Sequence, residues 1–145
     1  ILFYMAHTCS TMVLHCMDFR LGSAIRDELQ SRGILNDCDI VAIAGAGKTI
    51  VTKTDQIAWH DTAMSHIDLS KRLHDIKNLI IMNHTDCGAY GGRAAFESHA
   101  AEQDQHEKDL RAAKEVVLEA HPELNVQLTL VHIADDGSIS FENVE

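Results

Sequence analysis

The stretch NLIIMNHTDC occupies residues 78–87 and joins an apolar run to a group of chemically active side chains. Its Leu, Ile, Ile and Met residues are typical of a short strand that is buried on both faces of a sheet. Ligands of open α/β sheets bind beyond the carboxyl ends of the parallel strands. We therefore predict a buried strand over Asn78–Asn83 and functional residues directly after it.

The elements that precede this strand alternate between strands and helices. Short runs rich in Val, Ile or Leu predict strands, and apolar residues one turn apart predict helices. Thr54 and Asp55 are suitable caps for the second helix. The expected order is a strand at Thr11–Met17, a helix at Gly22–Ser31, a strand at Asp39–Ala44 and a helix at Thr54–Leu73.

The C-terminal part adds one long helix and two strands. A polar helical pattern at His99–Ala120 ends before Pro122, which cannot continue a helix, and an apolar run predicts a fourth strand at Val126–Ile133. Asp135-Asp136-Gly137 forms a turn into a short last strand at Ser138–Phe141. We predict an α/β fold with a mostly parallel sheet flanked by helices, to which the last strand could add as an antiparallel edge.

Composition argues against several classes of protein. The chain has 145 residues, enough for one domain over residues 1–145, and its 46% hydrophobic and 23% charged residues are ordinary for a globular protein. A net charge of -10 repels nucleic acid. No apolar run is long enough for a membrane span, and residues 1–6 lack the basic flank of a signal peptide. We expect a cytoplasmic protein whose thiols stay reduced.

A second chemically active segment, CMDFR at residues 16–20, ends the first predicted strand. It can therefore reach the same edge of the sheet as His84 and Cys87. Catalytic zinc is held by three protein ligands, commonly thiolates and imidazoles, and keeps its fourth position open. We predict that Cys16, His84 and Cys87 bind Zn2+. If Asp18 joined them as a fourth ligand, the same residues would form a closed structural site.

Asp18 and Arg20 form the predicted catalytic pair. In an extended chain Cys16, Asp18 and Arg20 share one side, whereas Met17 and Phe19 point to the other side and are expected to pack. Arg20 can hold Asp18 ionised and oriented, which leaves a carboxylate oxygen free to accept a proton from zinc-bound water.

Cys-x-Asp-x-Arg at 16–20 followed by His-x-x-Cys at 84–87 resembles the signature of the β-carbonic anhydrases. The His-Pro-Glu-Leu run at 121–124 and the turn after the fourth strand also resemble the C-terminal part of that family. The resemblance implies a zinc lyase that reversibly hydrates carbon dioxide to bicarbonate by a zinc-bound hydroxide, with Asp18 and Arg20 as the gating and orienting pair. It also implies a homodimer or a higher homo-oligomer.

Two departures from the family pattern affect the predicted pocket. Ala42-Ile43 stands where family members usually carry Arg-Asn, and Met17 and Phe19 replace small residues. The zinc ligands are untouched. Because function depends on the pocket, a related zinc hydrolase acting on carbonyl sulfide, carbon disulfide or another small electrophile stays open, as does a non-catalytic zinc module.

A competing interpretation concerns the segment AIAGAGKT at residues 42–49, which resembles a phosphate-binding loop. Its first Gly is replaced by Ala42, and it follows the second strand instead of the first. A nucleotide-binding module is therefore the alternative, and a glycine turn that lines the zinc cleft is the simpler interpretation.

Several further residues attract attention without an assigned role. Cys9 and Cys38 are interpreted as structural thiols, with a metal or disulfide partner as the alternative. His99 and His106 are expected on solvated helix faces. Tyr90 and the Gly91-Gly92 pair follow the predicted ligands closely enough to line the pocket, although packing explains them equally well.

Overall fold

The computed structural model describes residues 7–52 and 57–145, in which a five-stranded sheet has the order β2-β1-β3-β4-β5. Strands β2, β1, β3 and β4 are parallel, and β5 pairs with β4 in the antiparallel sense. The predicted α/β fold, including its antiparallel edge strand, is confirmed. The strands are β1 (Thr11–His15), β2 (Cys38–Ala42), β3 (Asn78–His84), β4 (Asn125–Ile133) and β5 (Ile139–Val144).

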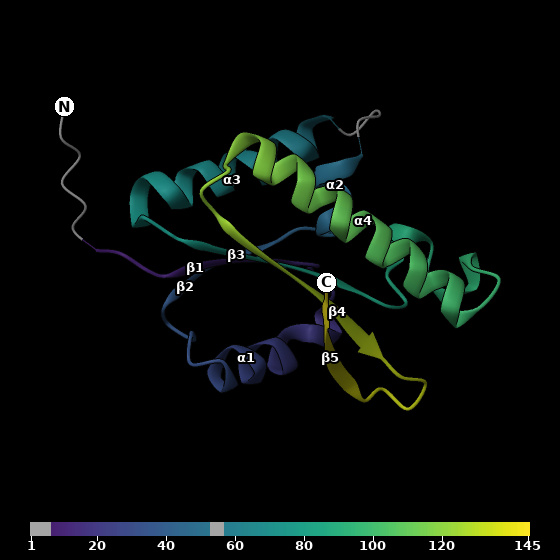
Figure 1. Ribbon diagram of the computed structural model, residues 1–145. Coiled ribbons are helices and arrows are strands. Elements are labelled where there is room, and N and C mark those ends of the chain that lie inside the picture. The colour runs from purple at the N-terminus through teal and green to yellow at the C-terminus, as the bar shows by residue number, and fades with distance from the viewer. Residues whose placement is uncertain (1–6, 53–56) are drawn as a thin grey trace.

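Helices cover both faces of the sheet. Figure 1 shows α1 on one face and α2, α3 and α4 on the other, and the two sets of buried side chains agree with this division. The predicted bounds of α1 and α4 are confirmed, whereas the caps proposed at Thr54 and Asp55 lie outside the described residues. The helices are α1 (Gly22–Ser31), α2 (Gly47–Val51), α3 (Ile57–His74) and α4 (His99–Ala120), with short 3-10 turns η1 (Phe19–Leu21), η2 (Gly88–Tyr90) and η3 (Arg93–Ala95).

Strand β3 lies at the centre of the core. Leu79 and Ile81 pack on the side of α2, α3 and α4, and Ile80 and Met82 pack on the side of α1. All four side chains are at most 3% exposed. Burial of such a side chain stabilises a fold by roughly 1.5–3 kcal/mol. A strand that is covered on both faces needs apolar residues at consecutive positions, which explains why its sequence does not alternate.

The segment after β1 differs from the extended strand that the sequence predicts. Strand β1 ends at His15, and Asp18 caps the turn η1 by accepting a hydrogen bond from the backbone N–H of Arg20 at 2.9 Å. Met17 and Phe19 are 67% and 91% exposed in the chain, so the expectation that they pack was wrong. The prediction assumed that side chains alternate in an extended strand through residues 16–20, but the strand ends at His15.

Strands β1 and β3 flank the point where the strand order reverses. From β1 the chain continues through α1 to β2 on one side, whereas β3 lies on the other side of β1. The crevice at such a reversal is where open α/β sheets bind ligands. In the described part of the chain, no helix is both long enough and apolar enough to cross a membrane.

Candidate metal centre

Cys16, His84 and Cys87 meet at the carboxyl ends of β1 and β3. Cys16 directly follows β1, His84 ends β3, and Cys87 lies on the turn that follows. All three side chains are at most 5% exposed. Their ligand atoms lie within 4.8 Å of one another. The structure therefore brings together the three residues that the sequence predicts as metal ligands.

The ring of His84 is held in one tautomer. Its Nδ1 lies 2.7 Å from the carbonyl oxygen of Thr85. Because a carbonyl oxygen only accepts, Nδ1 carries the proton and Nε2 carries the lone pair. This Nε2 is buried and has no hydrogen-bond partner among the residues that the structure describes. An unpaired buried acceptor costs free energy, and a coordinated cation would satisfy it.

The two sulfur atoms have the spacing that zinc requires. Two thiolates about 2.3 Å from a tetrahedral ion lie about 3.8 Å apart, and the Sγ atoms of Cys16 and Cys87 are 3.9 Å apart. A hydrogen bond from Cys87 lowers the pKa of the Cys16 thiol, and the same contact together with burial raises the pKa of Cys87. Without metal the pair thus retains one proton, which a divalent cation would displace. The residues fit a zinc ion.

Asp18 and Arg20 lie beside this cluster, as the sequence predicts. The Arg20 Nε and Nη2 atoms donate to Asp18 Oδ1 and Oδ2 at 3.0 and 2.8 Å. These bonds hold the pKa of Asp18 down at about 2, against the opposing effect of burial. Asp18 Oδ2 is also 3.9 Å from His84 Nε2. An ionised carboxylate therefore faces the ligand cluster. Arg20 holds both of its oxygens, so the expectation that one oxygen is left free was wrong.

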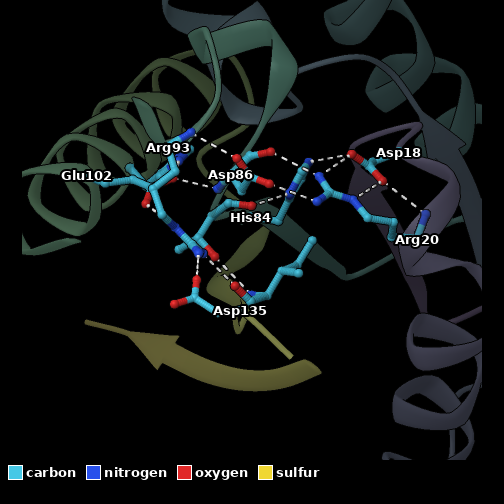
Figure 2. Close-up of polar contacts among 10 residues, drawn as sticks. Asp18, Arg20, His84, Asp86, Arg93, Glu102 and Asp135 are labelled. Carbon is cyan, nitrogen blue, oxygen red and sulfur yellow. Dashed lines mark hydrogen bonds and ion pairs between the residues drawn. The ribbon is translucent and has the colours of Figure 1, made fainter. Parts of the chain in front are cut away.

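Arg20 also contacts the turn at residues 84–87, which carries His84 and Cys87 and is here called the ligand turn. Its Nη1 donates to Asp86 Oδ2 at 2.8 Å, and its Nη2 donates to the Asp86 carbonyl oxygen at 2.9 Å (Figure 2). Asp86 lies between His84 and Cys87 in the chain and has a φ of +55°, a conformation that non-glycine residues rarely adopt. The contacts of Arg20 therefore help to fix the backbone that carries two of the three proposed ligands.

A further polar layer supports the turn from the α4 side. The buried carboxylate of Glu102 accepts from the Asp86 backbone N–H, and the Arg93 backbone N–H donates to Asp86 Oδ1 at 2.9 Å. Arg93 Nε lies 3.4 Å from Glu102 Oε2, which joins the two supports (Figure 2). Sequence analysis missed all three residues. Asp86 could have been found because it stands inside the His-x-x-Cys motif, whereas Glu102 sits in a polar helix with no local signal.

The segment at residues 42–49 packs against the ligand cluster. Gly45 N–H donates to Cys16 Sγ at 3.4 Å, and Gly47 N–H donates to Asn83 Oδ1 at 2.9 Å. Lys48 Nζ donates to the carbonyl oxygen of Ala89. In a phosphate-binding loop the glycine amides and the lysine point at the anion, but here these donors are used inside the protein. This geometry favours the glycine turn over the nucleotide-binding interpretation.

His106 occupies a different environment from the one that the sequence predicts. His99 is exposed as expected, but His106 is 0% exposed and its ring centroid lies 4.2 Å from that of Tyr90. The helix α4 buries a face that includes Glu102, His106 and Leu110, so polar residues stand where an apolar stripe would have revealed burial. Burial lowers the pKa of His106 to about 4 and keeps the ring neutral. Tyr90 itself donates to Asp109 Oδ2 at 2.7 Å.

Comparison with known families agrees with this geometry. A model of the family described as "Putative carbonic anhydrase" matches residues 5–143. The chain belongs to this family. A protein of Rickettsia bellii, described as an uncharacterized protein, is 31% identical over 133 residues, which cover 90% of this chain and 79% of that protein. Uncharacterized protein RC0076 of Rickettsia conorii is 27% identical over 133 residues, which cover 90% of this chain and 70% of that protein.

Solved structures that superimpose on this member of the carbonic anhydrase family are β-carbonic anhydrases. The β-carbonic anhydrase isoform I of Trichomonas vaginalis superimposes with a TM-score of 0.58 and 15% identity, over 100% of this chain and 90% of that chain. The β-carbonic anhydrase CafA of Aspergillus fumigatus gives a TM-score of 0.61 and 16% identity, over 96% of this chain and 77% of that chain. A chain from the crystal structures of two tetrameric β-carbonic anhydrases of Sordaria macrospora gives a TM-score of 0.51 and 16% identity, over 94% of this chain and 81% of that chain. The fold is that of the β-carbonic anhydrases.

Proposed function

We propose that this chain is a zinc-dependent carbonic anhydrase that hydrates carbon dioxide reversibly to bicarbonate. The observation that supports the proposal most directly is the unpartnered Nε2 of His84, buried beside two sulfur atoms that are 3.9 Å apart. Cys16, His84 and Cys87 would hold the ion. Membership of the carbonic anhydrase family supports the choice of reaction.

In the proposed mechanism, the chain supplies Asp18 as an acceptor and uses Arg20 to hold it in position. Zinc held by these residues supplies a Lewis acid that lowers the pKa of water toward about 7. Asp18 accepts the proton at Oδ2, the oxygen that lies 3.9 Å from His84 Nε2. Arg20 orients Asp18 through two hydrogen bonds and is itself anchored on Asp86. Arg20 keeps Asp18 ionised at neutral pH, so the carboxylate can accept a hydrogen bond from the water. With a pKa of about 2 it is a weak base and passes the proton on to solvent.

A small cavity lies next to the segments that carry the proposed ligands, although its lining includes none of the ligands. A cavity of about 160 Å³ is lined by Ala44, Lys48, Thr49, Trp59 and Ala89. Ala44 precedes the residue that donates to Cys16, and Ala89 lies two residues after Cys87, so the cavity adjoins the ligand segments. A volume of a few water molecules, each of which takes about 30 Å³, accommodates carbon dioxide or a molecule of similar size.

We also infer that the chain forms a homo-oligomer as one domain over residues 1–145. Phe19 is 91% and Met17 67% exposed, and both flank Asp18 in the segment beside the site. Large exposed apolar side chains mark interaction surfaces when they lie together. A second copy that covers them would close the site to bulk water. The tetrameric β-carbonic anhydrases of Sordaria macrospora support this assembly by analogy. Its four free cysteines suit a reducing compartment such as the cytoplasm.

Stopped-flow measurement of carbon dioxide hydration on zinc-loaded protein, with zinc counted per chain in the same sample, tests the proposal. We expect rapid turnover in wild type, and in Cys87→Ser the loss of turnover together with one zinc ion per chain. The matched control is Cys38→Ser, which removes a thiol on the same face of the sheet but away from the ligand cluster. Wild type that holds zinc at the cluster without hydrating carbon dioxide would contradict the proposed reaction. Activity toward carbonyl sulfide or carbon disulfide in the same protein would then identify it as a related zinc hydrolase.

A further inference from the structure

A second group of metal-binding side chains lies at the other end of the strands. Cys9, just before β1, Asp39 in β2 and His74 at the end of α3 bring their ligand atoms within 4.8 Å of one another. The strands that carry the first cluster at their carboxyl ends carry this one at their amino ends. The two clusters therefore share no residue, and β1 separates them.

The three side chains are held toward one another by contacts from different elements. His74 Nδ1 lies 2.9 and 2.8 Å from the two carboxylate oxygens of Asp39, and the Cys9 backbone N–H donates to the His74 carbonyl oxygen at 3.1 Å. Ser70 Oγ donates to Asp39 Oδ2. These contacts hold the three side chains next to one another. Metal binding displaces protons from ligand atoms, so an ion would take the place of the proton that His74 Nδ1 and the Asp39 carboxylate share.

Access also suits a cation. The side chains of Asp39 and His74 are 28% and 26% exposed, so an ion can reach them from solvent.

His7 offers a fourth donor. Its ring centroid lies 5.0 Å from that of His74, and its side chain is exposed. Sulfur, carboxylate and two imidazoles make a mixed set that zinc accepts in tetrahedral geometry and that magnesium and calcium do not favour.

We propose that Cys9, Asp39 and His74, completed by His7, form a second site for a divalent transition-metal ion of the zinc class. Its role is structural: the ion ties the start of β1 to β2 and to the end of α3. The site is separate from the proposed catalytic one and does not depend on carbonic anhydrase activity.

The disulfide alternative for Cys9 and Cys38 does not fit the structure. Cys9 packs against the core on the side of α2, α3 and α4, whereas Cys38 packs on the side of α1. The two thiols therefore lie on opposite faces of the sheet. Both are free, and both are half-buried, so Cys38 is a matched control for Cys9.

Zinc counting on the full chain tests the second site. After dialysis against buffered Zn2+, we expect Cys9→Ser to hold one zinc ion fewer per chain than wild type, and Cys38→Ser to hold as many as wild type. This difference is independent of the first cluster, because the first cluster is present in all three proteins. Equal zinc content in wild type and Cys9→Ser would overturn the proposal, as would loss of the ion from Cys38→Ser alone.

Thiol labelling of wild type provides a second measurement that needs no variant. The rates at which iodoacetamide alkylates Cys9 and Cys38 are compared by peptide mass spectrometry, with Zn2+ and after its removal by a chelator. We expect Zn2+ to slow alkylation of Cys9 by about tenfold or more, because a thiolate bound to the metal is no longer free to attack, and to leave Cys38 unchanged. If Zn2+ leaves the rate at Cys9 unchanged, the proposal is wrong even where Cys9→Ser fails to fold.

Discussion

Arg20 holds Asp18 by both carboxylate oxygens, with Nε 3.0 Å from Oδ1 and Nη2 2.8 Å from Oδ2. The same guanidinium donates to Asp86 at 2.8 Å. One side chain therefore links the segment after β1 to the ligand turn after β3. Because the guanidinium is planar and its donors are fixed in direction, it sets the orientation of Asp18 relative to the ligand cluster.

Asp18→Asn tests whether this orientation serves proton transfer. The amide keeps nearly the same shape but cannot accept the proton as a carboxylate does. We expect zinc content to stay at the wild-type value and kcat to fall by about 100-fold or more, the usual contribution of general acid–base catalysis. Zinc analysis and stopped-flow kinetics measure the two quantities. The control is Asp27→Asn, an exposed carboxylate on α1, which should leave both unchanged. An unchanged kcat in Asp18→Asn would remove Asp18 from the mechanism.

The order of elements and the ligand trio could be predicted because their signals are local. A strand buried on both faces has a continuous apolar run, as at Asn78–His84, and the ends of α4 are marked by Ser98, which caps its first turn, and by Pro122. His84 and Cys87 follow such a run directly. Parallel pairing then brings Cys16 to them without further information.

What the sequence did not predict depends on contacts between distant segments. Glu102 reaches the Asp86 backbone across 16 positions in sequence, and no pattern in α4 marks it. His106 is buried because its ring packs on Tyr90. Periodicity detects a buried helix face from its apolar residues, so it does not detect a buried histidine. The cluster of Cys9, Asp39 and His74 joins three segments with no shared motif. Each of these features appears only when the fold is complete.

Glu102→Gln is expected to loosen the ligand turn. The carboxylate accepts from the Asp86 backbone N–H and contacts Arg93, and the neutral amide weakens both contacts. Outer contacts of this kind contribute about 10- to 100-fold to metal affinity. We therefore expect zinc affinity, measured by competition with a chromogenic chelator, to fall by at least tenfold. Glu115→Gln changes an exposed glutamate on the same helix and serves as the control. Equal affinities in the two variants would show that Glu102 does not support the metal centre.

Gly47→Ala is expected to destabilise the protein because the first residue of α2 has no room for a side chain. A Cβ at this position would lie 2.9 Å from Asn83 Oδ1, the atom that accepts the Gly47 N–H, and 3.3 Å from a methyl carbon of Ile81. Overpacking of this kind costs about 1–3 kcal/mol. Gly22→Ala is the matched control, since a Cβ there meets no atom within 4 Å. Urea unfolding of both variants measures the effect. A Gly47→Ala variant as stable as Gly22→Ala would mean that the start of α2 can shift away from Asn83.

His106→Leu should change how stability depends on pH. Burial holds the pKa of His106 at about 4, and an unfolded histidine titrates near 6.5. Below pH 6.5 the unfolded chain therefore binds a proton that the folded chain excludes, so wild type loses stability as the pH falls toward 4. Between pH 7.5 and 5 this loss amounts to about 2 kcal/mol for one such group.

The leucine variant lacks the titrating group, so its free energy of unfolding should fall less steeply over the same range. Neither ring nitrogen of His106 has a hydrogen-bond partner among the described residues, so the substitution breaks no such bond. Any loss of zinc at low pH affects both proteins, and the difference between them isolates His106. His99→Leu, on the exposed first turn of the same helix, should retain the wild-type slope. Parallel slopes for wild type and His106→Leu, measured by urea unfolding from pH 7.5 to 5, would mean that His106 takes up its proton inside the folded protein.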